Sequence, residues 1–155
     1  MPGNAELIAR FISRVSGKPV DRMDVMMAFG QKSYLLAQDS QDRVVALMGW
    51  QVENLIMRAD EFYIEPTAPR EVIIAALVAA IAEASKELQS EVGFLLLSEG
   101  IAPETLQAFV NNGYERTTIE EIRVPAWREA VHEMVDGNPR ILTKKLRADR
   151  IMRPI

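Results

Sequence analysis

The chain has 155 residues, no cysteine and a formal net charge of -4 at pH 7. We expect residues 1–155 to form one domain with a C-terminal tail over about 148–155, because this length is enough for one hydrophobic core. The absence of cysteine excludes disulfides and zinc–thiolate sites. The negative charge argues against a nucleic-acid partner.

The apolar segments predict a protein without a membrane partner. The longest apolar run, from Val72 to Ala82, is shorter than the about 20 residues that a helix needs to cross a bilayer. The first residues include an acid and show no charged-then-apolar leader, so we expect a cytoplasmic protein.

The N-terminal half predicts two helices followed by three strands. Apolar residues recur at every third or fourth position after Asn4, the expected N-cap of the first helix. A shorter helix starts at Asp21, and its methionines, Met23 and Met27 among them, are expected in the core, with an adaptable ligand-binding wall as the alternative. Extended segments are then predicted over Ser33–Gln38, Arg43–Val52 and Asn54–Ile64, of which the first two form a hairpin.

In the C-terminal half, predicted helices alternate with strands. Pro69 suits the first turn of a helix, which is expected over Val72–Leu88. The continuous apolar run Val92–Leu97 is typical of a strand at the centre of a sheet, reached by a β-α-β crossover. The remaining predicted elements are a helix over Pro103–Asn111, a strand over Tyr114–Val124, a helix over Ala126–Val135 and a last strand over Ile141–Leu146.

This order of elements is typical of the α+β class, with a mixed, mostly antiparallel sheet flanked by helices. From Asn138 to Ile155 the chain is locally basic. We expect its last strand at an edge of the sheet, where lysines hinder pairing with other chains. His132 is the only histidine and is expected on the surface, so the sequence offers no metal site.

Four phrases of the sequence, in this order, are similar to the GCN5-related N-acetyltransferases (GNAT). They are SYLLAQDSQDRVVALMGWQ at 33–51, FYIEP at 62–66, ETLQAFVNNGYE at 104–115 and ILTKKL at 141–146. They resemble the family's first hairpin, the end of its fourth strand, its helix-to-strand passage and its closing strand. The resemblance covers about 5–147 and implies an acyl-CoA N-acyltransferase-like fold with acetyl-CoA or another acyl-CoA as the cofactor.

The resemblance also implies a place for acyl-CoA. Backbone groups of Tyr63 and Ile64 would pair with its pantetheine arm as an added strand, and its phosphates would lie over the N-terminus of the helix after Pro69. The residues implied in phosphate binding are Arg70, Glu71, Val72, Ile73 and Ile74. Arg70 is alternatively a solvated residue of the first helical turn.

Two departures from the family concern the chemistry. The stretch from Thr67 to Ile74 contains no glycine, whereas the family uses glycines there to bring backbone N–H groups close to the pyrophosphate. Glu71 also adds a negative charge where the phosphates would lie. Phe109 stands where the family often has a tyrosine that protonates the departing thiolate, and phenylalanine has no proton to donate.

Asp60 and Glu61 are the candidate general bases, because a carboxylate near the thioester would take the proton of the acceptor amine. Adjacent strand residues face opposite sides, so at most one is expected to point into a cleft. Alternatively, both are exposed carboxylates at a strand end. The function expected is an N-acyltransferase acting on a small-molecule amine or a protein. The alternative is a catalytically inactive protein of the same fold that binds a partner or senses coenzyme A. For either function, a homodimer is among the expected partners.

Overall fold

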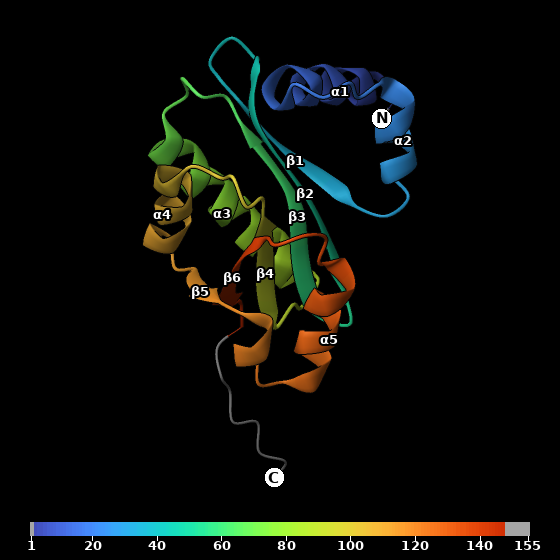
Figure 1. The fold of residues 1–155 in the computed structure, drawn as a ribbon. Helices are drawn as coiled ribbons and strands as arrows, with labels where there is room; N and C mark the ends of the chain where they lie inside the picture. The colour runs from blue at the N-terminus through green and yellow to red at the C-terminus, as the bar shows by residue number, and fades with distance from the viewer. Residues whose placement is uncertain (1, 148–155) are drawn as a thin grey trace.

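The computed structural model describes residues 2–147, so the predicted tail over 148–155 lies outside the described residues. The helices are α1 (Pro2–Ser16), α2 (Arg22–Ala28), α3 (Arg70–Glu87), α4 (Pro103–Asn111), α5 (Pro125–Met134) and the 3-10 helix η1 (Ile119–Glu121). The strands are β1 (Ser33–Gln38), β2 (Val44–Glu53), β3 (Ile56–Ile64), β4 (Val92–Leu97), β5 (Glu115–Thr117) and β6 (Arg140–Lys145) (Figure 1).

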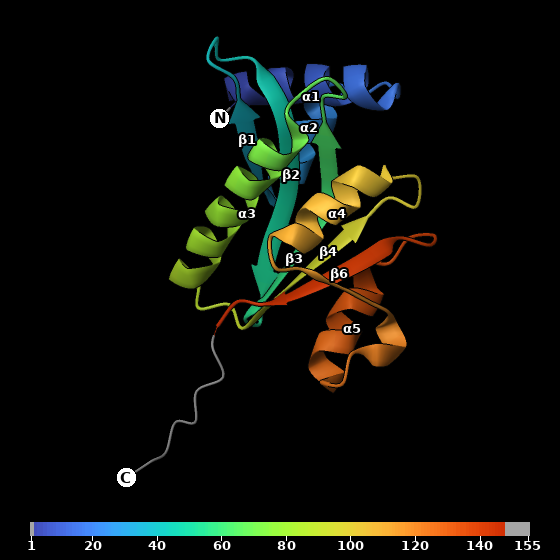
Figure 2. The ribbon, with the colours of Figure 1, turned by 90° about the vertical axis from the view of Figure 1, so that its left-hand side faces the viewer.

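Within these residues the strands form one six-stranded sheet in the order β1-β2-β3-β4-β6-β5. Only β3 and β4 run parallel, and α3 makes the crossover between them. Figure 2 shows α3 and α4 on one face of the sheet, with α1, α2 and α5 on the other. The predicted class, a mixed and mostly antiparallel sheet flanked by helices, is confirmed.

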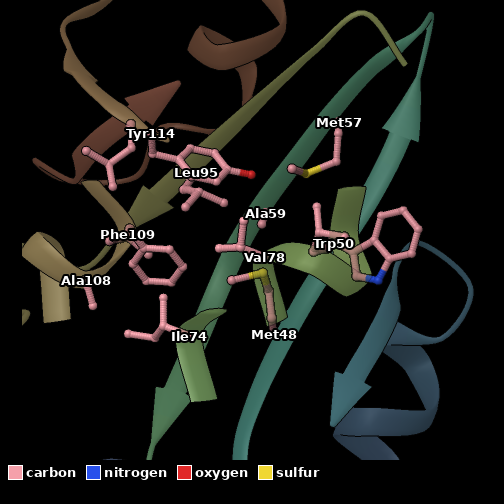
Figure 3. Packing of buried hydrophobic residues seen from close by; sticks show 13 residues of the cluster. Met48, Trp50, Met57, Ala59, Ile74, Val78, Leu95, Ala108, Phe109 and Tyr114 are labelled. Carbon is pink, nitrogen blue, oxygen red and sulfur yellow. The ribbon is translucent and has the colours of Figure 1, made fainter. Parts of the chain in front are cut away.

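The hydrophobic core is divided between the two faces of the sheet. One cluster joins the sheet to α3 and α4, and Ile74, Leu95 and Phe109 are among its fully buried members (Figure 3). A second cluster joins the sheet to α1 and α2, and a third joins it to α5. Buried β4 lies between the covered faces, which explains why its sequence is apolar throughout.

The helix starts follow local sequence rules, with one correction. Asp21 caps α2 as predicted, in a capping box with Asp24. Asn4, predicted as the cap of the first helix, lies inside α1, which begins at Pro2. The prediction that Met23 and Met27 lie in the core is wrong, because they are 60% and 72% exposed on the outer side of α2.

Three predicted strands differ from the structure. The segment expected as a strand over Tyr114–Val124 forms only the short β5, because the hydroxyl of Thr118 accepts a hydrogen bond from the Glu121 N–H and starts η1. The last strand was expected at an edge, but β6 pairs with both β4 and β5. The third strand begins at Ile56 because residues 54 and 55 have positive φ and form the turn after β2.

No helix within residues 2–147 is both long enough and apolar enough to span a membrane.

Candidate active site

The centre of the candidate site is a bulge in β3. Gly49 pairs with Glu61 and Trp50 pairs with Ala59, which makes Asp60 the extra residue on β3. The bulge shifts the alternation of side chains: Ala59 joins the cluster on the α3 face, whereas Tyr63 joins the cluster under α1 and α2.

Asp60 and Glu61 consequently bind the same cation. Nζ of Lys32 donates to Oδ1 of Asp60 at 2.7 Å and to Oε1 of Glu61 at 3.0 Å. The expectation that these neighbours face opposite sides is therefore wrong, since the bulge interrupts the regular pleat. The Lys32 side chain is only 12% exposed, against 30% for Asp60 and 24% for Glu61.

Tyr34 and Gly49 complete the cluster. The Tyr34 hydroxyl donates to Oε1 of Glu61 at 2.8 Å, so this oxygen accepts two hydrogen bonds. A Cβ on Gly49 would lie 3.1 Å from Oε1 of Glu61 and equally close to side-chain carbons of Lys32 and Tyr34. Glycine at this position therefore leaves the room in which the cluster forms.

The carboxylates of the cluster change the pKa values of Lys32 and Tyr34. Burial lowers the pKa of Lys32, but the hydrogen bonds and charges of Asp60 and Glu61 outweigh burial and raise this pKa above its ordinary value. Burial, the hydrogen bond to Glu61 and its charge together raise the pKa of Tyr34 strongly. Lys32 is therefore held as an ammonium and Tyr34 as a neutral donor.

Beyond the bulge, β3 and β4 separate. Their parallel pairing ends at Ala59 and Leu95, although β3 continues along β2 to Ile64 and β4 continues along β6 to Leu97. The side of β3 that faces β4 has no strand partner from Asp60 onward within the described residues. An extended ligand can add to such an unpaired strand edge by main-chain hydrogen bonds.

The N-terminus of α3 lies just beyond this edge. Pro69 is its N-cap and makes no side-chain capping bond, and the first N–H bonded back to the cap is that of Ile73, to the Pro69 carbonyl at 3.1 Å. The N–H groups of Arg70, Glu71 and Val72 precede this bond and are the ones that a helix start leaves free.

Side chains of the predicted phosphate-binding stretch point in several directions. Ile73 is 8% exposed and Ile74 is fully buried, so these two side chains belong to the core rather than to a ligand site. Val72 is 69% exposed. Glu71 accepts a long hydrogen bond from Asn111 of α4, at 3.4 Å. Nε of Arg70 is buried and has no partner within the described part of the chain.

No protein-family model matches the chain, and no curated protein matches it in sequence. Solved structures match its fold. A GNAT phosphinothricin acetyltransferase from Sinorhizobium meliloti, solved with acetyl-CoA, has a TM-score of 0.70 at 12% identity, over 100% of this chain and 90% of that one. The ribosomal-protein-S18-alanine N-acetyltransferase from Escherichia coli has a TM-score of 0.67 at 10% identity, over 99% and 94%. The PaiA N-acetyltransferase from Thermoplasma acidophilum, solved with coenzyme A, has a TM-score of 0.63 at 10% identity, over 93% and 94%.

The chain has the GNAT fold. At these identities the likeness concerns the fold alone, and the chemistry has to be derived from the residues of this chain.

Phe109, at the position where the resemblance implies a proton-donating tyrosine, is part of a cluster of aromatic rings in the core. Phe109 is fully buried, and its ring lies 5.2 Å from that of Phe62 and 6.2 Å from that of Tyr114 (Figure 3). Tyr114 is also buried, which raises the pKa of its hydroxyl. Tyr114 lies in the same core cluster as Phe109, and His132 is exposed as expected.

A cavity of about 930 Å³ lies away from the carboxylate cluster. It is bounded by α1, the β1–β2 turn and the start of α3, where Val72 and Ile73 line it, and neither Lys32 nor Glu61 does. Its lining carries three arginines and three acids, and each of these arginines already binds a carboxylate. The charges of the cavity lining balance, three positive against three negative, and we take the bulge of β3 as the candidate site.

The sequence pointed to Asp60 and Glu61 as candidate bases but gave no indication that Lys32, Tyr34 and Gly49 lie beside them. No local pattern marks Lys32, which lies in the loop before β1, 28 positions before Asp60. Only the pairing of the first hairpin with the third strand could have indicated these residues. That pairing puts Tyr34 opposite Gly49 and Gly49 opposite Glu61, so the three residues lie side by side across the sheet.

Proposed function

We propose that this protein is an acyl-CoA-dependent N-acyltransferase that acts in the cytoplasm on an amine of a small molecule or of a protein. The observation that carries the proposal is the separation of β3 from β4 after Ala59, with two carboxylates at the bulge where the strands part. Structures of the same fold have been solved with acetyl-CoA or coenzyme A.

The cofactor proposed is acetyl-CoA or another acyl-CoA, bound along β3. Tyr63 and Ile64 lie in the part of β3 whose edge β4 leaves unpaired, and backbone groups of this part would pair with the extended pantetheine arm. The N–H groups of Arg70, Glu71 and Val72 would bind the phosphates at the start of α3, since a helix N-terminus carries a partial positive charge. Arg70 supplies the only full positive charge in the stretch 65–74.

The residues at the bulge have a defined task in acyl transfer. Acyl-CoA supplies a thioester, and its C–S bond breaks as the acceptor nitrogen bonds to the acyl carbonyl carbon. The carboxylate pair of Asp60 and Glu61 takes the proton that the acceptor ammonium must lose before its nitrogen attacks, and the nitrogen releases a second proton to solvent once the C–N bond has formed. The leaving thiolate takes its proton from solvent, because Phe109 has none to give.

A second candidate is a catalytically inactive protein that binds a partner or senses coenzyme A. Two observations favour it: the start of α3 has no glycine, and Phe109 fills the place of the acid. The discriminating experiment measures the loss of acetyl-CoA thioester over a panel of amines, with Glu61→Gln and Asp60→Asn as matched variants. Turnover that falls in both variants supports the enzyme; tight binding of acetyl-CoA without turnover supports the sensor.

A further inference from the structure

We infer that Lys32 is a positioning residue, which holds the carboxylates of Asp60 and Glu61 together at the β3 bulge. Its Nζ bonds both carboxylates, at 2.7 and 3.0 Å, from a side chain that is 12% exposed. That Lys32 holds the two carboxylates follows from these distances alone. That the carboxylates in turn act on the acceptor amine rests on the proposed function.

Because of the bulge, two negative charges lie side by side, and a cation between them reduces their repulsion. The bulge brings two carboxylates from adjacent residues onto the same side of β3, where two like charges disfavour each other's ionised state. Lys32 reduces the charge of the group from two negative charges to one. It also fixes the direction of each carboxylate, because it binds Oδ1 of Asp60 and Oε1 of Glu61.

The pair keeps the capacity to accept a proton. Within residues 2–147, Oδ2 of Asp60 and Oε2 of Glu61 accept no hydrogen bond. The two side chains are 30% and 24% exposed, so an acceptor ammonium can approach them from solvent. Lys32 lies on the buried side and cannot itself leave without breaking both bonds.

Two tyrosines lie beside this pair. Tyr34 from β1 donates to Glu61, and Tyr63 lies on the same strand two residues further on. Burial and the charge of Glu61 raise the pKa of Tyr63, whereas Lys32 lowers it. Both tyrosines are therefore neutral below pH 10, and within residues 2–147 Lys32 is the only cation that bonds the two carboxylates.

The inference is tested by a carbon-13 NMR titration of the carboxyl groups in the protein without any ligand. In Lys32→Met, we expect one of the two carboxyls to titrate about one pH unit or more above its wild-type midpoint. Lys32→Arg is expected to keep the wild-type midpoints. The matched control is Lys86→Met, because Lys86 is an exposed lysine of α3 and its removal leaves both carboxyls unchanged. Wild-type midpoints in Lys32→Met would overturn the inference.

A measurement on the unmodified protein keeps the inference testable if Lys32→Met does not fold. The Lys32 ammonium is expected to exchange its protons slowly and to titrate above 10.5 in nitrogen-15 NMR, because both carboxylates hold it. Titration at or below 10.5 would contradict the inference.

Kinetics then connect Lys32 to the proposed function. In Lys32→Met we expect the acidic limb of the pH–rate profile to move to higher pH, with the affinity for acetyl-CoA unchanged. If the wild type does not bind acetyl-CoA, the proposed function fails while the NMR result for Lys32 stands. If acetyl-CoA binds and the acidic limb does not move, Lys32 does not act on the base.

Discussion

Gly49 lies directly opposite Tyr34 on the neighbouring strand, and a Cβ on Gly49 would come 3.1 Å from the Tyr34 ring. The same Cβ would come equally close to Glu61 and Lys32. We therefore expect Gly49→Ala to lower the free energy of unfolding by about 1–3 kcal/mol, because the cluster has to move apart. Urea denaturation measures this change. The control is Gly100→Ala, where no atom lies within 4 Å of the new Cβ and the stability should stay near that of the wild type.

Phe109→Tyr tests whether the missing acid can simply be restored. Phe109 is fully buried between Phe62 and Tyr114, so a hydroxyl added to its ring enters an apolar core. We expect a loss of about 1–3 kcal/mol in the free energy of unfolding and no gain in the rate of thioester loss. A faster rate at unchanged stability would show that the ring reaches the leaving group and that the place of Phe109 in the core is misjudged.

Arg58 attaches α5 to the sheet. It is 5% exposed, and its Nη1 donates to the carbonyl of Ala130 at 2.8 Å. Arg58→Met keeps the aliphatic part of the side chain but removes the charged hydrogen bond to this carbonyl, which costs about 1–3 kcal/mol. Hydrogen exchange should become faster in α5 and stay unchanged in α3. Arg116→Met, which removes an exposed arginine of β5, is the matched control. Equal effects of the two variants would contradict this role.

The stability of the protein should fall in alkali. The pKa of Lys32 is raised above 10.5, and the pKa values of Tyr34, Tyr63 and Tyr114 are raised above 10.0. Above pH 10.0 the unfolded chain therefore binds fewer protons than the folded one, and the free energy of unfolding decreases as pH rises. Urea midpoints between pH 9 and pH 12 measure the decrease. Tyr34→Phe should make it shallower, and a flat profile in the wild type would contradict these shifts.

Regular segments of the chain were predictable because their signals are local. The strands at Ser33–Gln38 and Val92–Leu97 and the helix at Pro103–Asn111 have the predicted bounds. In these segments the local preference of the residues, for a strand in the apolar runs and for a helix start at the proline, is the same as the structure that the folded chain adopts there. The choice of β6 as an edge strand failed because its neighbour β5 is only three residues long and has no strong sequence pattern.

The geometry of the site was less predictable, for a physical reason. A bulge depends on how two strands pair, and the register between Gly49 and Glu61 is not written in the residues around Asp60. Lys32 reaches its partners only after β1, β2 and β3 have assembled, so no spacing along the chain marks it. The two carboxylates could therefore be named as candidates from the sequence, whereas the cation that they share could not.

Calorimetric titration of acetyl-CoA into the protein tests the central claim most directly. We expect saturable heat with one ligand bound per chain, and a rise in the melting temperature that grows with ligand concentration. Titration without heat, together with an unchanged melting temperature at millimolar acetyl-CoA, would contradict the proposal that the unpaired edge of β3 and the start of α3 form an acyl-CoA site.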